Sequence, residues 1–181
     1  MKSFILLAGI FLMTTISKPE NINFGKESGG QDWWVLNDGV MGGLSQGAIQ
    51  FTDESLLFKG KVSLENNGGF ASIRSPFQAI DLSTTEMIEI RYRATGQSFA
   101  LTLAKDRRYY IPNYKHSLPE TAGEWKTVQM PLKNFKEHQV GRPTGNFLTP
   151  ELRNHIIRMG LITNDKRASD FELEVDYLTF Q

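Results

Sequence analysis

Cysteine is absent from all 181 residues of the sequence. This absence excludes disulfides, thiolate metal ligands, cysteine nucleophiles and lipid attachment through an N-terminal cysteine. Histidine is scarce, and His116, His138 and His155 show none of the close spacings that indicate a zinc site. We therefore expect no metal site and no cofactor.

Excess charge of either sign is also missing, since 20 Lys and Arg residues balance 20 Asp and Glu residues. A non-specific nucleic-acid binder would carry a basic excess, so nucleic acid is not an expected partner. Hydrophobic residues make up 40% and charged residues 22% of the chain, which is typical of a soluble globular protein. The length predicts one domain with a substantial core.

The apolar run at residues 4–13 is too short to span a bilayer comfortably, which takes about 20 residues. Lys2 precedes this run, and the mostly small, polar residues 14–17 follow it. That three-part layout predicts a secretory signal peptide over residues 1–17 and an exported protein, periplasmic or secreted. An uncleaved anchor is the alternative, and no stable membrane span is expected in the mature chain.

Helical patterns are nearly absent, apart from a short turn at residues 149–153 with Thr149 as cap and Pro150 at the first position. Short runs with period-two alternation dominate instead and indicate strands with one buried face. An Asn67-Gly68 turn between two such runs predicts a β-hairpin. The predicted strands lie at 48–51, 56–58, 61–64, 70–74, 87–93, 99–104, 125–130, 156–163 and 171–177.

Many short strands and almost no helix predict an all-β, single-domain sandwich of the jelly-roll type. Residues 18–32 include a stretch rich in Gly, Asn and Ser, and we expect them to form a loose lead-in. The sandwich domain is then predicted over residues 33–181.

Two segments are distinctive enough to carry a family resemblance. Residues 34–45 read WVLNDGVMGGLS, and residues 65–74 read ENNGGFASIR after the Phe-Lys-Gly at 58–60. Together they resemble the complex I intermediate-associated protein 30 family, with weaker agreement over the rest of 33–181. The resemblance implies a galactose-binding-like β-sandwich.

The mitochondrial members of that family are assembly factors for respiratory NADH:ubiquinone oxidoreductase. The resemblance therefore implies a non-catalytic, protein-binding module that acts in assembly or as a chaperone. A secretory signal would place this chain outside the compartment of those members. A carbohydrate-binding module, which the galactose-binding-like fold would accommodate, is the alternative.

Nine residues are candidates for ligand binding, and each has a structural alternative. Asn and Asp in the two Gly-rich motifs suit tight turns, but they could also present amide and carboxylate groups, or hold Ca²⁺, at one rim. Adjacent arginines on a strand pair with acids on a solvated face, or they bind an anion or sugar hydroxyls. The candidates are Trp34, Asn37, Asp38, Asn66, Asn67, Arg74, Arg91, Arg93 and Tyr109.

Large aromatic residues fill the core of a small sandwich or stack on sugar rings. In an extended pair such as Trp33-Trp34 the two rings point opposite ways, so one of them is expected to be exposed. The same alternation predicts one exposed ring in the pair Tyr109-Tyr110. Tyr114 and Trp125 are the remaining aromatic candidates.

The pentapeptide at 43–47 matches the G-x-S-x-G nucleophile elbow of serine hydrolases, with Ser45 as the nucleophile. That elbow needs a strand before the serine and a helix after it, whereas residues 48–51 read as a strand. We therefore expect no catalysis by Ser45.

Overall fold

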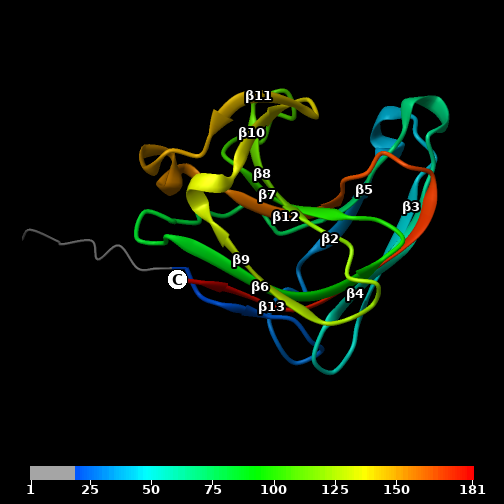
Figure 1. Cartoon of the computed structure of the whole chain (residues 1–181), viewed down its shortest axis with the longest axis horizontal. Helices are drawn as coiled ribbons and strands as arrows, with labels where there is room; N and C mark the ends of the chain where they lie inside the picture. Colours follow the sequence, from blue (N-terminus) through cyan, green and yellow to red (C-terminus); the bar gives the residue numbers. More distant parts are fainter. Residues whose placement is uncertain (1–18) are drawn as a thin grey trace, which may run out of the picture.

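The computed structural model describes residues 19–181, so the predicted signal peptide lies outside the described residues. Two antiparallel sheets pack face to face in these residues (Figure 1). The architecture confirms the predicted all-β sandwich.

The six-stranded sheet has the order β3-β4-β13-β6-β9, and β1 pairs with the end of β13. Its strands are β1 (Ile22–Asn23), β3 (Gln46–Phe51), β4 (Leu56–Val62), β6 (Met87–Thr95), β9 (Lys126–Pro131) and β13 (Ser169–Phe180).

The seven-stranded sheet has the order β11-β10-β8-β7-β12-β5-β2. Its strands are β2 (Trp34–Asn37), β5 (Ala71–Arg74), β7 (Phe99–Ala104), β8 (Asn113–Leu118), β10 (Lys136–Gln139), β11 (Arg142–Phe147) and β12 (Arg158–Thr163).

Four short 3₁₀ helices lie in the connections between strands: η1 (Asp38–Met41), η2 (Glu65–Asn67), η3 (Leu132–Asn134) and η4 (Pro150–His155). The last of these confirms the predicted turn with Pro150 at its first position. Thr149 occupies the N-cap position, but its side chain makes no capping hydrogen bond.

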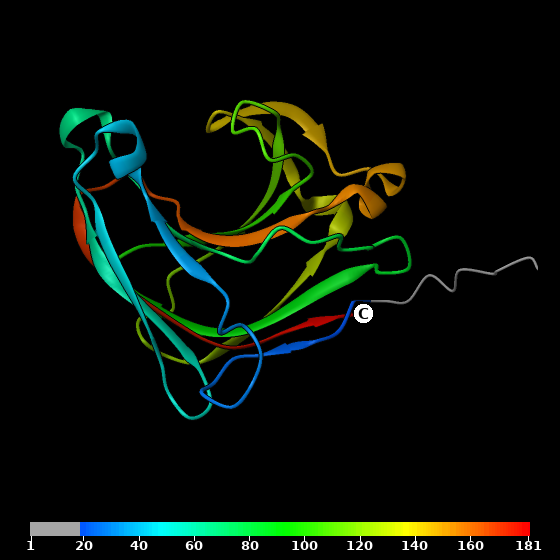
Figure 2. The ribbon, with the colours of Figure 1, turned by 180° about the vertical axis from the view of Figure 1, so that it is seen from behind.

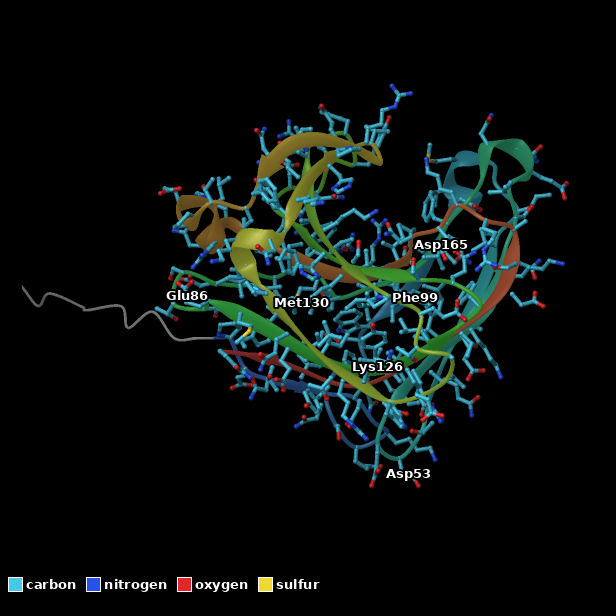
Figure 3. All side chains as sticks on the ribbon, viewed as in Figure 1. Asp53, Glu86, Phe99, Lys126, Met130 and Asp165 are labelled. Carbon is cyan, nitrogen blue, oxygen red and sulfur yellow. The ribbon has the colours of Figure 1, made fainter. Side chains whose placement is uncertain are left out.

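The core lies between the sheets and follows the predicted alternation. Ile88, Ile90 and Tyr92 of β6 are fully buried, as are the alternate residues of β7 that begin with Phe99. Figure 3 shows Phe99 and Met130 pointing into the space between the sheets. Each such side chain stabilises the fold by roughly 1.5–3 kcal/mol through removal of apolar surface from water.

One alternation prediction is wrong, at the end of β13. The pairing between β13 and β6 shifts between Val175 and Tyr177, which marks a β-bulge. The extra residue reverses the alternation, so Leu178 and Phe180 are buried and Tyr177 points outward to Glu89. Sequence periodicity alone does not reveal a bulge.

The predicted hairpin at Asn67-Gly68 is also wrong. The strand before this turn, β4, belongs to the six-stranded sheet, whereas β5 after it belongs to the seven-stranded sheet. Asn66 and Asn67 adopt positive φ, 54° and 60°, but Gly68, the second residue of the predicted turn, has φ −65°. The turn therefore carries the chain from one sheet to the other.

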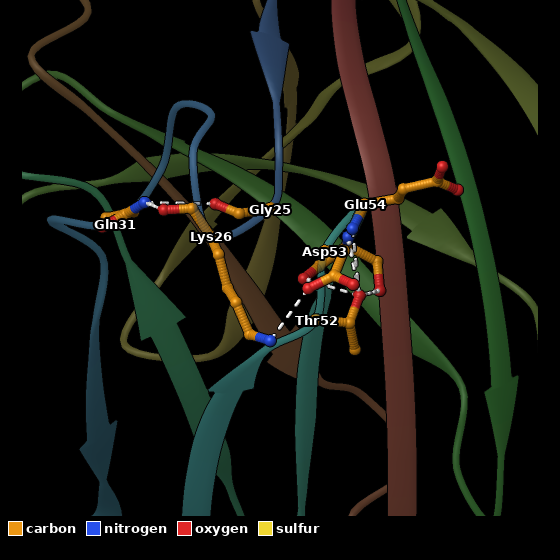
Figure 4. Close-up of polar contacts among 7 residues, drawn as sticks. Gly25, Lys26, Gln31, Thr52, Asp53 and Glu54 are labelled. Atoms are coloured by element: carbon orange, nitrogen blue, oxygen red, sulfur yellow. Dashed lines mark hydrogen bonds and ion pairs between the residues drawn. The ribbon is translucent and has the colours of Figure 1, made fainter.

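The segment before β2 is packed against the sandwich and is not a loose lead-in. Phe24 is 1% exposed and contacts buried Trp33 edge to face, with ring centroids 5.3 Å apart. The Lys26 ammonium pairs with the Asp53 carboxylate at 2.8 Å, which links this segment to the β3–β4 turn (Figure 4).

The seven-stranded sheet curls strongly, as Figure 2 shows. β10 and β11 rise at one end of this sheet, and the loops that contain η1 and η2 rise at the other, with β12 low between them. The outer face of the sheet is therefore concave.

Candidate functional site

The strand register places one row of side chains across the concave face. Trp34 pairs with Arg74, Arg74 with Gly160, Gly160 with Thr102, Thr102 with Lys115, and Lys115 with Lys136. Alternate residues of these strands supply the core on the other face, so the members of this row point away from it. A row of this kind brings together residues far apart in the sequence.

An arginine and two aromatic rings form a stacked cluster at the β2 end of the row. The Arg158 Cζ atom lies 3.5 Å from the ring centroid of Phe77 and 4.5 Å from that of Trp34. The Arg158 Nε donates to the Ser75 carbonyl at 3.1 Å, which fixes the guanidinium plane. Trp34 stays 38% exposed, so part of its indole is open to a ligand.

Two further arginines adjoin this cluster. The Arg107 Cζ lies 4.7 Å from the ring centroid of Phe77, and Arg74 lies in the row beside Trp34. Burial, together with the positive charges of Arg74 and Arg107, lowers the pKa of Arg158 to about 10. Burial also lowers the pKa of Arg74. The Arg158 guanidinium therefore remains charged at neutral pH.

None of these three arginines has a carboxylate within 4.0 Å among residues 19–181. Like charges held together without a counter-ion raise the free energy of the folded state. Groups whose pKa values are perturbed in this way cluster at functional sites.

A pocket of about 440 Å³ opens at the β8 and β10 end of the same face. Burial and the nearby Lys166 lower the pKa of Lys115 in its wall. The Lys115 ammonium donates to the Asn164 Oδ1 at 3.0 Å. The lining residues are Lys115, His116, Ser117, Asn134, Lys136, His138, Pro143 and Asn164.

Between the arginine cluster and the pocket, the floor of the face is made of small residues. A Cβ atom on Gly160 would lie 3.0 Å from the Thr102 Oγ1 and 3.3 Å from the Arg74 Cγ. The missing side chain leaves room for the Arg74 side chain beside β12.

The sequence-predicted candidates are divided among four places. Trp34 and Arg74 lie in the row on the concave face. Tyr109 lies in the β7–β8 loop and is 77% exposed, edge to face with the exposed Tyr110. The expected split of one buried and one exposed ring holds for Trp33 and Trp34.

The two Gly-rich motifs meet at one rim of the sandwich, with Asp38 as the link. Its carboxylate accepts hydrogen bonds from the Ser45 hydroxyl at 2.5 Å and the Gly69 N–H at 2.6 Å. The N–H groups of Phe70 and Ser45 also donate to it. These donors occupy the buried carboxylate, which opposes the calcium hypothesis because a cation needs free oxygen lone pairs.

Among the amide residues of these motifs, Asn66 and Asn67 are exposed at the turn, in or near left-handed backbone geometry. Asn37 points between the sheets, and its Oδ1 is buried without a hydrogen-bond partner among the described residues. Of the four Asn and Asp candidates, only Asn66 and Asn67 are available to a ligand.

Arg91 and Arg93 lie on the opposite surface of the molecule, the outer face of the six-stranded sheet. Arg91 pairs with Asp176, and Arg93 pairs with Glu174 at 2.5 Å. Both guanidinium groups also lie over Trp125, with Cζ 4.6 and 5.0 Å from the ring centroid. This is the ion-paired arrangement that the structural alternative described.

Ser45 is 6% exposed, and strand β3 follows it where a nucleophile elbow has a helix. Its hydroxyl hydrogen-bonds to Asp38 and Ser63, and no histidine among residues 19–181 bonds to it. The geometry of a serine nucleophile is therefore missing at this residue.

Sequence reasoning missed Arg158, Phe77, Arg107, Lys115 and Lys136. Arg158 lies in the predicted strand at 156–163, which was the only signal for it, whereas Lys115 lies in β8, a strand that the sequence did not predict. Their grouping depends on the order β8-β7-β12-β5, which places residues 74 and 158 on neighbouring strands. Periodicity gives the face of a strand but not its neighbours.

A family model described as Complex I intermediate-associated protein 30 matches residues 22–175. Among curated proteins, no sequence matches the chain significantly. Among residues 19–181, no helix combines the length and apolar character that crossing a bilayer requires.

Solved structures with the same fold include carbohydrate-binding modules. The family 11 module of the cellulosomal cellulase Lic26A-Cel5E of Clostridium thermocellum is 14% identical, with a TM-score of 0.62 over 90% of this chain and 94% of that chain. A structure of the family 11 module with a β-1,3-1,4-mixed-linked tetrasaccharide has a TM-score of 0.60 at 14% identity, over 87% and 94%.

A glycoside hydrolase domain of Endo-D from Streptococcus pneumoniae R6 is 13% identical, with a TM-score of 0.51 over 82% of this chain but only 21% of that chain. Likenesses at such identities show the fold alone. They confirm the predicted galactose-binding-like β-sandwich.

Proposed function

The chain belongs to the complex I intermediate-associated protein 30 family, and from that premise we propose that it is a binding module whose ligand is an oligosaccharide chain on the concave face of the seven-stranded sheet. The single observation that carries this proposal is the cluster of Trp34, Arg158 and Phe77 on the same face as an open pocket. The structure of the same fold in complex with a mixed-linked tetrasaccharide supports it.

The chemistry of the face suits sugars. An exposed indole offers an apolar surface for the C–H face of a pyranose ring, and fixed polar groups beside it can hydrogen-bond to hydroxyls. Trp34 supplies such a surface, and Thr102 with Asn164 supplies polar groups in and beside the row.

Trp34→Ala tests the proposal in affinity electrophoresis and calorimetry against a panel of neutral and acidic polysaccharides. The protein is expected to bind at least one glycan, and the variant is expected to bind it at least tenfold more weakly, which corresponds to about 1.4 kcal/mol. Trp125→Ala is the matched control because that ring lies on the opposite sheet. Binding to no glycan, or equal losses in both variants, would overturn the proposal.

A protein partner, which the family description suggests, is the second candidate function. It is favoured by exposed apolar side chains on the rim loops around η1 and η2, namely Val40, Met41, Leu44 and Leu64. Exposed apolar groups that gather on one rim are typical of protein interfaces. Met41→Asp together with Leu64→Asp would abolish capture of a protein partner and leave glycan binding unchanged, because neither residue lies in the row.

Export remains a proposal that rests on the pattern of residues 1–17. Mass spectrometry of the protein purified from its native cells tests it directly. An N-terminus near residue 18 supports cleavage and export. A chain that retains Met1 and is found in the cytoplasmic fraction would contradict both.

A further inference from the structure

The arginines on the two outer faces of the sandwich differ in their ion-pair partners. On the six-stranded sheet, Arg91 and Arg93 each have a carboxylate partner. On the concave face, Arg74, Arg107 and Arg158 have none among the described residues. Since both faces belong to one near-neutral chain, the missing acids on the concave face are a local property and do not follow from the composition.

Acidic residues do occur around the concave face, but they are already engaged. Asp106 binds the Arg108 guanidinium, and Glu137 accepts hydrogen bonds from Thr144 and Asn146 and pairs with Lys105. Asp165, labelled in Figure 3, accepts from the Ser98 N–H and hydroxyl and pairs with Arg167. These acidic side chains therefore do not neutralise Arg74, Arg107 and Arg158, whose charges are available to a ligand.

The free donors have the geometry that an anion needs. The Arg158 Nε is engaged with Ser75, and its remaining N–H groups have no hydrogen-bond partner among residues 19–181. A guanidinium held over aromatic rings with two terminal nitrogens free can bind the two oxygens of a carboxylate or sulfate. Arg74 and Arg107 increase the positive potential at the same point.

Positively charged side chains occur again at the pocket end of the row. Lys115 lies three strand spacings from Arg74, about 14 Å along the sheet, and Lys136 lies one strand further. A single small anion cannot reach both ends. A chain that carries repeated negative charges and lies across the strands can contact the arginine cluster and the lysines together.

We propose that the ligand of the concave face is an acidic polysaccharide, with carboxylate or sulfate groups along its chain, and not a neutral glucan. The inference rests on the proposed function and specifies its substrate class. The sugar rings stack at Trp34, while the anionic groups bind at the arginine cluster and at Lys115 and Lys136.

Calorimetry and affinity electrophoresis with polygalacturonate and chondroitin sulfate as acidic probes, and with mixed-linkage β-glucan as the neutral probe, test this inference. The intact protein is expected to bind an acidic probe at least tenfold more tightly than the neutral one. Binding is expected to weaken as salt rises, because added ions screen charges beyond the Debye length of about 8 Å at physiological ionic strength.

Variants locate the binding on the face. Arg74→Gln with Arg158→Gln is expected to lose at least tenfold in affinity for the acidic probe, and Arg91→Ala with Arg93→Ala is the matched control with unchanged affinity. Arg107→Gln and Lys136→Gln change exposed residues, so they test the charge even where the double variant fails to fold.

The possible outcomes separate the inference from the function on which it rests. Tight binding to the neutral glucan alone would overturn the inference and leave the sugar-binding proposal intact. Binding to no glycan would overturn both. Equal affinity for an acidic polypeptide such as polyglutamate would overturn the inference by showing that the face selects charge without sugar. Loss in the control variant equal to that in Arg74→Gln/Arg158→Gln would also overturn it.

Discussion

The Ser45 hydroxyl lies 2.5 Å from the Asp38 carboxylate within the first of the two motifs that carry the family resemblance, and the same carboxylate binds the second motif. Asp38 follows β2, Ser45 precedes β3, and the N–H groups of Gly69 and Phe70 reach the same carboxylate from the turn before β5. A Cβ atom at Gly43 would lie 2.4 Å from the Asp38 Cγ, so that glycine is required by the close packing. The two motifs therefore build one rim of the sandwich.

Asp38→Asn is expected to lower the free energy of unfolding by roughly 2–3 kcal/mol. The amide would direct an N–H group at backbone donors that need an acceptor, and it would remove the buried charge that they stabilise. Urea denaturation followed by tryptophan fluorescence measures the change. Asp53→Asn, at an exposed carboxylate that pairs with Lys26, is the control and is expected to cost under about 1 kcal/mol.

The same carboxylate predicts a dependence of stability on pH. Burial acts to raise the pKa of Asp38, but hydrogen bonds from Ser45, Gly69 and Phe70 outweigh it and hold the pKa below its ordinary value. A depressed pKa contributes stability that is present above the unfolded-state pKa of about 3.9 and is lost as the pH falls through the folded-state value. The stability gap between the protein and Asp38→Asn should therefore shrink on acidification below about pH 4. A gap that widened there would contradict the assignment.

Ser45→Ala is expected to lower the free energy of unfolding by about 1–2 kcal/mol. It removes a hydroxyl that donates a hydrogen bond to Asp38 and accepts one from the Ser63 N–H. Glycan binding should be unchanged, since Ser45 does not lie on the concave face. Thermal unfolding and the glycan assay together check both points. A glycan-cleaving or esterase activity that this substitution abolished without loss of stability would restore the nucleophile hypothesis.

Phe24→Ala is expected to destabilise the sandwich by about 3 kcal/mol or more, because it leaves a cavity beside Trp33 in the core. Lys26→Ala, two residues further on, removes only an exposed ion pair and should cost under about 1 kcal/mol. Denaturant midpoints for the two variants make the comparison. Similar small costs for both would mean that the segment before β2 contributes little to the domain.

Arg91→Ala with Arg93→Ala should lower stability only modestly, by less than about 1 kcal/mol for each partly exposed ion pair. Fluorescence of Trp125 is expected to change, because both guanidinium groups lie over its ring. A loss of glycan binding in this variant would move the site to the six-stranded sheet.

The sequence was sufficient to predict the class of fold and most of the strands. Period-two alternation in residues 87–93 and 99–104 identified which side chains are buried, because hydrophobic burial determines that pattern directly. The bulge near Tyr177 and the sheet exchange at Asn67 were not predictable, since both depend on strand pairing.

The same limit applies to the candidate site. Trp34 and Arg74 were identified as candidates, but their partner Arg158 follows Arg74 by a long stretch of sequence and reaches it only because β12 pairs with β5. From the sequence alone, Arg91 and Arg93 have the pattern of a binding site because their ion-pair partners cannot be recognised. Those partners, Glu174 and Asp176, lie on β13, and periodicity does not show that β13 pairs with β6.

The position of β13 has a consequence for how the protein folds. This strand follows all other strands in the described chain, yet it lies between β4 and β6 and pairs with both along most of its length. The six-stranded sheet therefore cannot form completely before β13 has been synthesised. The contacts of β13 also join residues that are distant in sequence, and such contacts slow folding. We expect nascent chains that lack β13 to remain open and sensitive to protease, and the domain to become compact only after synthesis has passed this strand.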